Sequence, residues 1–161
     1  MTGGWAPLLT AASAAVLVAV VGGVATRTDA WYRRLRQPAW KPPDWAFGPV
    51  WAVIFACTAT AGVLAWNADA GTGARSALIA AYAVNGVLNM AWSVLFFRLR
   101  RPDWAFAEVL ALWLSVLVVT MVTGRVSVTA GLLKLPYLAW VGTASYLNWT
   151  ILRLNPSLRE A

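Results

Sequence analysis

Tryptophan is the functional residue type that stands out in this chain, because eleven tryptophans occur among its 161 residues. Four of them fall in one stretch, WYRRLRQPAWKPPDWAFGPVW, which runs from Trp31 to Trp51 and also holds four prolines. An indole ring is large and flat and donates a hydrogen bond. It therefore suits both an anchor at a membrane interface and a wall around a flat apolar ligand. We expect the functional site at this stretch, with interface anchoring as the alternative for Trp31, Trp40 and Trp45.

Other kinds of chemistry have few candidate residues. The chain has no histidine, which is the commonest metal ligand, the usual axial ligand of haem iron and the usual general base. Its one cysteine, Cys57, lies within an apolar run and cannot form an intrachain disulfide. No acid–base dyad and no activated nucleophile is evident in the sequence. We predict no metal site and no required cofactor.

Composition indicates a membrane protein. Hydrophobic residues make up 60% of the chain and charged residues only 12%, about half the charged fraction of a typical soluble domain. The net charge of +7 comes from basic residues that cluster between apolar runs. This placement favours lipid headgroups over nucleic acid as the partner.

Five apolar segments are long enough to cross a bilayer as helices, which takes roughly 20 residues each. They span about 5–25, 47–66, 76–97, 104–123 and 128–152. We interpret residues 1–161 as one all-α domain, a bundle of five transmembrane helices. The first segment is also compatible with a cleaved signal peptide, but no basic residue precedes it, which favours a retained helix.

The basic residues predict the orientation. Ten of them flank the segments on one side, and two, Arg75 and Arg125, lie on the other. The ten are Arg27, Arg33, Arg34, Arg36, Lys41, Arg98, Arg100, Arg101, Arg153 and Arg159. The positive-inside rule then places the first loop and the C-terminus in the cytoplasm and the N-terminus outside. This prediction assumes a bacterial cell membrane.

Several aromatic and amide residues recur on single helical faces. Trp51 shares a face with Phe47 and Phe55 in the second segment. In the third segment the spacing i, i+4, i+7 and i+11 aligns a second set, which consists of Asn85, Asn89, Trp92 and Phe96. An amide inside the bilayer needs a partner, which is either another helix or a ligand.

The fifth segment has a similar face, formed by Tyr137, Trp140, Ala144 and Asn148. The small Ala144 beside the large Trp140 leaves a slot for a flat ring, although ordinary helix packing explains it too. Two charged residues also fall inside the segments. We interpret Lys134 as an interface anchor, and Glu108 as a snorkelling or helix-paired acid, with a proton relay as the alternative.

Three blocks of this sequence, taken in order, resemble the tryptophan-rich sensory protein and translocator protein (TspO/MBR) family. They are WYRRLRQPAWKPPDWAFGPVW, NMAWSVLFFRLRRPDWA from Asn89, and LLKLPYLAWVGTASYLNWTILRLN from Leu132. The resemblance covers nearly the whole chain. It implies a homodimer of five-helix bundles that binds porphyrins and other flat apolar ligands in a pocket under the first loop.

The resemblance also implies which residues line that pocket. Tyr32, Pro42, Trp51, Asn89, Trp140 and Ala144 match family pocket positions, and we add Trp92 and Tyr137 from the same helical faces. One departure is Gln37, where the family usually has Lys. The animal members carry a cholesterol-recognition stretch, but the matching SYLNWTILR has Tyr146 and Trp149 at the wrong positions, so tight sterol binding is not expected.

The leading functional interpretation is a membrane receptor or carrier for porphyrins that acts as a sensor, regulator or transporter. The alternative is an enzyme-like, light-dependent oxidative degradation of bound porphyrin, which would depend on Trp51 and Trp140. A lipid-bilayer scaffold without a small ligand is a third reading. For the homodimer, the small residues Ala77, Ala81 and Gly86 make the third segment the predicted interface.

Overall fold

The chain forms a bundle of long helices, seen in a computed structural model that describes residues 5–68 and 71–159. All regular secondary structure within these ranges is helical, which confirms the all-α prediction. The elements are α1 (Trp5–Ala25), α2 (Ala30–Arg34), α3 (Asp44–Asn67), α4 (Gly71–Ser93), the π-helix η1 (Val94–Arg98), α5 (Pro102–Val126), α6 (Val128–Leu132), α7 (Leu135–Leu154) and the 3₁₀ helix η2 (Pro156–Arg159).

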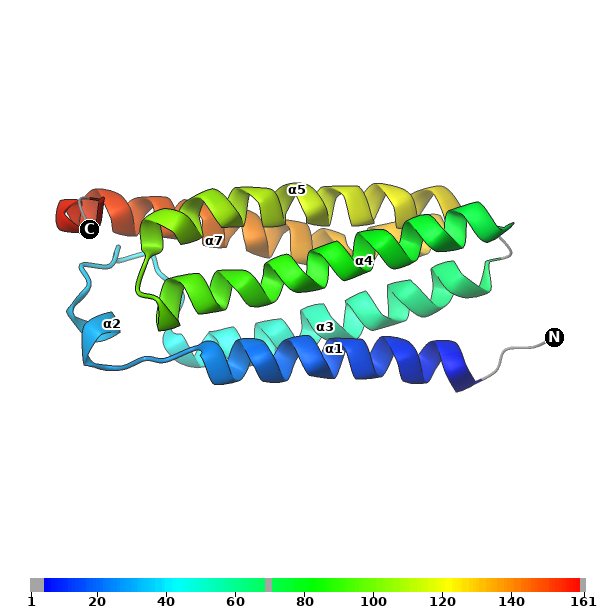
Figure 1. Cartoon of the computed structure of the whole chain (residues 1–161), viewed down its shortest axis with the longest axis horizontal. Helices are drawn as coiled ribbons and strands as arrows, with labels where there is room; N and C mark the ends of the chain where they lie inside the picture. Colours follow the sequence, from blue (N-terminus) through cyan, green and yellow to red (C-terminus); the bar gives the residue numbers. More distant parts are fainter. Residues whose placement is uncertain (1–4, 69–70, 160–161) are drawn as a thin grey trace.

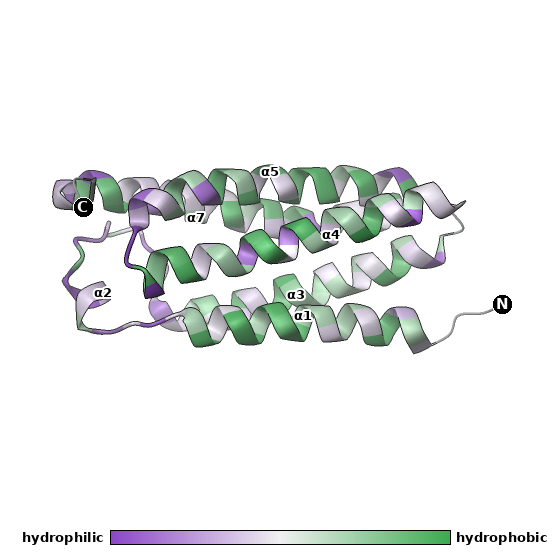
Figure 2. Cartoon of the chain, in the orientation of Figure 1, coloured by the Kyte–Doolittle hydropathy of each residue, from purple (hydrophilic) through white to green (hydrophobic). Residues whose placement is uncertain are grey.

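Within the described residues, four helices are long and apolar enough to cross a membrane, namely α1, α3, α4 continued by η1, and α5. Figure 2 shows hydrophobic residues along all of these long helices rather than on one stripe of each. Large apolar side chains such as Leu17, Val53 and Leu114 point away from the protein and are more than half exposed. Lipid solvates such surfaces whereas water does not, so the chain is an integral, multi-pass membrane protein.

Helix α7 is not one of these four helices, but it is also long. Its 20 residues are about 30 Å long, enough for the bilayer core. It packs along α5, and its buried residues include Tyr137 and Asn148 as well as Val141. Helix α7 thus combines the length of a membrane span with a polar interior face.

The connections gather at the two ends of the bundle in the way that the charge pattern predicts. Figure 1 shows the first loop with α2, the α4–α5 turn and the C-terminus at one end, and the N-terminus at the other. Two arginines tie this end together. Arg100 forms an ion pair with Asp29 at 3.0 Å, and Arg98 Nη2 donates to the carbonyl of Val24 at 2.6 Å.

The third and fifth apolar segments are not continuous α-helices. The third ends in η1, whose wider turn brings the consecutive Phe96 and Phe97 into the same buried cluster. The fifth is divided into α6 and α7 by a short turn at Leu133 and Lys134. Pro136 stands in the first turn of α7, where a missing N–H costs nothing.

The interpretation of Lys134 as an interface anchor is wrong, because its side chain is fully buried. Its Nζ donates to Thr58 Oγ1 at 3.2 Å and lies 4.6 Å from the ring centre of Tyr82 and 5.2 Å from that of Tyr137. The break between α6 and α7 turns this residue toward α3 and α4 instead of toward the headgroups. The aromatic faces and the hydroxyl replace part of the solvation that burial removes.

Candidate ligand-binding site

A hydrophobic cluster with aromatic side chains packed around it occupies the interior between α3, α4, α5 and α7. Its buried members are Ile54, Val109, Leu112, Val116, Tyr137 and Val141. Trp51 lies at its edge, stacked on Phe55 at 5.3 Å and in edge-to-face contact with Tyr137 at 5.8 Å between ring centres. These rings offer both a flat surface and an edge to a flat apolar ligand.

One buried hydrogen bond crosses this cluster. Asn89 Nδ2 donates to the Tyr137 hydroxyl at 2.8 Å, and both side chains are buried. About one turn of α4 away, Asn85 Nδ2 donates to Ser115 Oγ at 3.0 Å. Asn85 therefore makes the interhelical bond expected of an amide in a span, whereas Asn89 lies beside the aromatic rings.

Trp92 connects this interior to a second cluster under the first loop. It stacks on Phe96 with ring centres 5.3 Å apart, and its Nε1 donates to Asn148 Oδ1 at 3.3 Å. Asn148 in turn donates to the carbonyl of Pro102 at 2.8 Å. The second cluster contains Tyr32, Phe96, Phe97, Ala105 and Ile151. The aromatic interior thus extends without interruption to the underside of the first loop.

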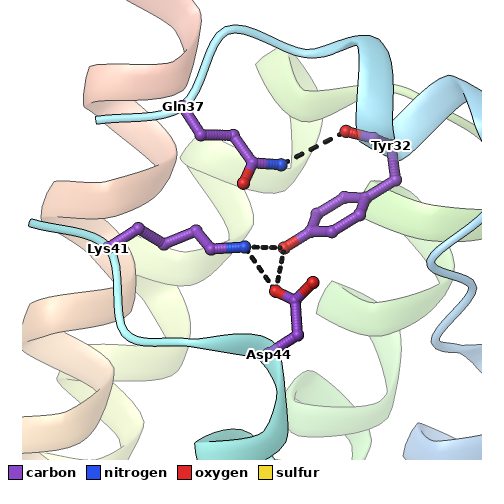
Figure 3. A network of polar contacts seen from close by, with 4 residues as sticks. All are labelled: Tyr32, Gln37, Lys41 and Asp44. Atoms are coloured by element: carbon purple, nitrogen blue, oxygen red, sulfur yellow. Dashed lines mark hydrogen bonds and ion pairs between the residues drawn. The ribbon is translucent and has the colours of Figure 1, made fainter. Parts of the chain in front are cut away.

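A polar latch holds the first loop over this end (Figure 3). Tyr32 is buried, and its hydroxyl accepts from Lys41 Nζ at 2.8 Å and donates to Asp44 Oδ1 at 3.2 Å. Lys41 also forms an ion pair with Asp44, the first residue of α3. Gln37 Nε2 donates to the Tyr32 carbonyl at 3.2 Å. Side chains before and after the loop prolines are thereby joined.

Two pKa shifts accompany this latch. Burial raises the pKa of Tyr32 above its ordinary value, even though the hydrogen bond from Lys41 acts in the opposite direction. Burial disfavours the charged form of Lys41, but its hydrogen bonds to Asp44 and Tyr32 outweigh this and raise its pKa. Both shifts keep the phenol neutral and the ammonium charged through the neutral pH range.

A groove of about 390 Å³ lies on the outside of the bundle between α3 and α7. Its lining is almost wholly apolar and consists of Pro49, Val50, Val53, Ile54, Pro136, Ala139, Trp140 and Thr143. Trp140 also packs against the interior cluster and meets Phe47 edge-to-face at 5.4 Å. Trp140 thus forms a common wall between the groove and the aromatic interior.

Comparison with known sequences identifies a protein family. The model of the TspO/MBR family matches residues 10–154. The chain belongs to the TspO/MBR family. It is 40% identical over 132 residues to the tryptophan-rich protein TspO of Chlorobaculum tepidum, which covers 78% of this chain and 80% of that protein.

Two further TspO/MBR relatives extend the comparison. The tryptophan-rich sensory protein of Cereibacter sphaeroides is 32% identical over 157 residues, 98% of this chain and 96% of that protein. The human translocator protein is 32% identical over 130 residues, 80% of this chain and 77% of that protein. The family resemblance of the three sequence blocks is therefore confirmed.

The structure brings most of the predicted TspO/MBR pocket residues into one region. Trp51, Asn89, Tyr137 and Trp140 contact the same interior cluster or one another, and Trp92 joins it to the second cluster. Tyr32 belongs to that second cluster under the loop. The other two predicted residues, Pro42 in the loop and Ala144 on α7, are both half-buried. Their part in ligand binding stays a prediction.

Other residues that matter to the site have weak signals in the sequence. Lys41 and Asp44 hold the Tyr32 hydroxyl in place, but a basic and an acidic residue three positions apart are common on any exposed loop.

Trp40 and Trp45 are exposed, in agreement with their interpretation as interface anchors. Among the residues that the structure describes, no three His, Cys, Asp or Glu side chains come together as a metal site.

Proposed function

We propose that this TspO/MBR protein is an integral membrane receptor or carrier for porphyrins and other flat apolar ligands. The main supporting observation is the aromatic interior formed by Trp51, Tyr137 and Trp140, together with the buried Asn89 amide that is hydrogen-bonded to Tyr137. Such a site offers stacking surfaces together with one donor that orients the ligand. Its occupancy would serve sensing, regulation or transport.

The latch supports a pocket that closes from the loop end. Tyr32 is part of the second cluster and is held by Lys41 of the loop, so a ligand held below it would be shielded from water. Pro42 stiffens the loop on the far side of Lys41. In this proposal Ala144 leaves room for the ring system and Trp92 forms the wall toward the loop.

A metal-free porphyrin should bind at least as well as haem, and no cofactor is needed for binding. The chain has no histidine, and its one cysteine, Cys57, is half-buried on α3 outside both aromatic clusters. Haem iron would therefore gain neither a histidine nor a cysteine axial ligand from the pocket. Neither tight sterol binding nor nucleic-acid binding is part of this proposal, and the membrane lipid is the remaining partner.

The deciding experiment is a porphyrin titration followed by tryptophan fluorescence quenching. Trp51→Phe and Trp140→Phe should each weaken binding several-fold, because ring stacking contributes about 0.5–1.5 kcal/mol and 1.4 kcal/mol is about tenfold. Ala144→Thr should also weaken binding, because the larger side chain would narrow the space for the ring system. Trp5→Phe is a matched control, since Trp5 is 78% exposed at the opposite end. Parental affinity in all three pocket variants would place the ligand elsewhere.

For the membrane arrangement, we propose five spans in a bacterial cell membrane, with α6 and α7 together as the fifth. The basic loops then lie in the cytoplasm and the N-terminus outside. An odd number of spans puts the two termini on opposite sides. Reporter fusions at each terminus test this, and a cytoplasmic N-terminus would overturn it.

The proposed homodimer forms through α4. Ala77 is exposed and Ala81 is half-exposed, whereas Gly86 faces α1, where an added Cβ would lie 3.5 Å from the Val18 side chain. The dimer contact should therefore centre on the first two. Ala81→Phe should give monomers in detergent, and an unchanged dimer would remove α4 from the interface.

Light-dependent oxidative degradation of a bound porphyrin is the second candidate. The contact of Trp51 with Tyr137 favours it, because adjacent indole and phenol rings are readily oxidised side chains beside the proposed ligand. Illumination of the porphyrin complex in the presence of dioxygen should then give a new absorbing product. Its formation at the same rate in Trp51→Phe and Trp140→Phe would argue against this activity.

A further inference from the structure

Glu108 is the one described carboxylate within a membrane span whose two oxygens are both buried and have no hydrogen-bond partner. The interpretation of Glu108 as a snorkelling or helix-paired acid is therefore wrong. Its carboxyl group does not reach the surface, and no side chain in the described ranges pairs with it. A partnerless carboxyl is costly in a membrane interior, and such residues commonly mark functional sites.

Three interior amides and the buried lysine already have partners. Asn85 pairs with Ser115, Asn89 with Tyr137, and Asn148 with both Trp92 and the carbonyl of Pro102. The buried cation Lys134 donates to Thr58 and lies over two aromatic rings. The missing partner of Glu108 is therefore not supplied by these groups.

The packing register places Glu108 at the depth of the candidate site. Helices α4 and α5 are antiparallel, and the Asn85–Ser115 hydrogen bond aligns them at one level. Seven residues toward the first loop, about 10 Å along each axis, bring α4 to Trp92 and α5 to Glu108. Seven residues make almost two full helical turns. Trp92 therefore lies on the same face of α4 as Asn85, and Glu108 lies on the same face of α5 as Ser115.

The side chains around Glu108 at this depth are apolar and aromatic. Ala105, Val109 and Leu112 adjoin Glu108 on α5 and are all buried, and Trp92 belongs to both aromatic clusters. A ligand stacked among these rings would thus present its edge to a carboxylate that has unused acceptor capacity.

We propose that Glu108 is the residue through which this protein selects flat apolar ligands that carry a basic nitrogen. The proposal rests on the function proposed above, since it assumes that flat apolar ligands enter the aromatic interior. The protonated nitrogen donates to the Glu108 carboxylate and neutralises it, while the rings contact the apolar remainder of the ligand.

The test compares two probes that differ in one group, 1-pyrenylmethylamine and 1-pyrenylmethanol. Binding to the full chain in phosphatidylcholine nanodiscs is followed by energy transfer from tryptophan to pyrene, with empty nanodiscs as the partition reference. The parent protein should bind the amine about tenfold more tightly than the alcohol, which corresponds to about 1.4 kcal/mol. In Glu108→Gln this ratio should fall close to one.

Asp103→Asn is the matched control. It removes a carboxylate of the same helix that is already paired with Arg101, and it changes the net charge equally. It should leave the ratio unchanged. An equal ratio in the parent and Glu108→Gln, or a loss of the ratio in Asp103→Asn, would overturn the proposal. If neither probe binds saturably to the parent, the proposed function fails instead.

A second measurement uses the unmodified protein and does not depend on the folding of a variant. Infrared difference spectroscopy reports changes in the hydrogen bonding of a buried carboxyl group. The amine should change the carboxyl bands and the alcohol should not. Unchanged carboxyl bands at saturating amine would refute the assignment of Glu108.

Discussion

The hydrogen bond from Asn89 to Tyr137 allows the candidate site to be tested by stability and by binding at once. The two groups are 2.8 Å apart, and both side chains are buried. Tyr137→Phe leaves the Asn89 donor unpaired, and Asn89→Leu leaves the Tyr137 hydroxyl unpaired. Each single change should cost about 1–2 kcal/mol of unfolding free energy, given the cost of an unsatisfied buried group and the weaker average inside membranes.

The double variant should cost much less than the sum, because it removes both polar groups and leaves none unpaired. The expected coupling energy is therefore about 1 kcal/mol or more. Unfolding with increasing dodecyl sulfate in mixed micelles, followed by circular dichroism, measures it. Tyr82→Phe is the matched control, since the Tyr82 hydroxyl makes only a long 3.4 Å contact to the Thr58 carbonyl.

The same variants separate a structural amide from one that contacts the ligand. If Asn89 orients the porphyrin, Asn89→Leu should weaken binding by about fivefold, as expected for about 1 kcal/mol. Tyr137→Phe should not weaken it through this amide, because the donor is freed for the ligand. Additive stability costs, or equal porphyrin affinity in Asn89→Leu and the parent, would refute the role assigned to this pair.

Two further predictions concern the latch and the α5–α6 contact. The latch should stay closed at neutral pH and open as the pH rises above about 10, because the pKa values of Tyr32 and Lys41 are raised from 10.0 and 10.5 and the stability they add is lost on deprotonation. Near-ultraviolet circular dichroism should show this transition, and Lys41→Met should lack it. Gly131→Ala should destabilise the protein by about 1–3 kcal/mol, because a Cβ there would lie 2.7 Å from the Gly124 Cα. Gly23→Ala, which meets nothing within 4 Å, should be neutral or slightly stabilising in the same unfolding assay, and equal effects of the two changes would contradict the close-contact argument.

Some features of this protein follow from the sequence because they are local. The length of an apolar run determines whether a helix can cross a bilayer, and basic residues between runs determine which loops share a side. Ring contacts one turn apart, such as Trp51 with Phe55 and Trp92 with Phe96, follow from helix periodicity alone. These features predicted the helical membrane class and most residues of the aromatic interior.

Only the tertiary structure decided how those helices pair. Asn89 and Tyr137 are 48 positions apart, and the depth at which they meet depends on how far α4 and α7 slide and rotate. In lipid the outer face of a helix is as apolar as its inner face, so hydrophobic patterning cannot set that rotation. For the same reason, the sequence does not predict that Lys134 is buried or that Glu108 has no hydrogen-bond partner. A charged residue in an apolar run has the same sequence pattern whether its side chain reaches the headgroups or faces the interior. The packing between helices determines which of the two occurs.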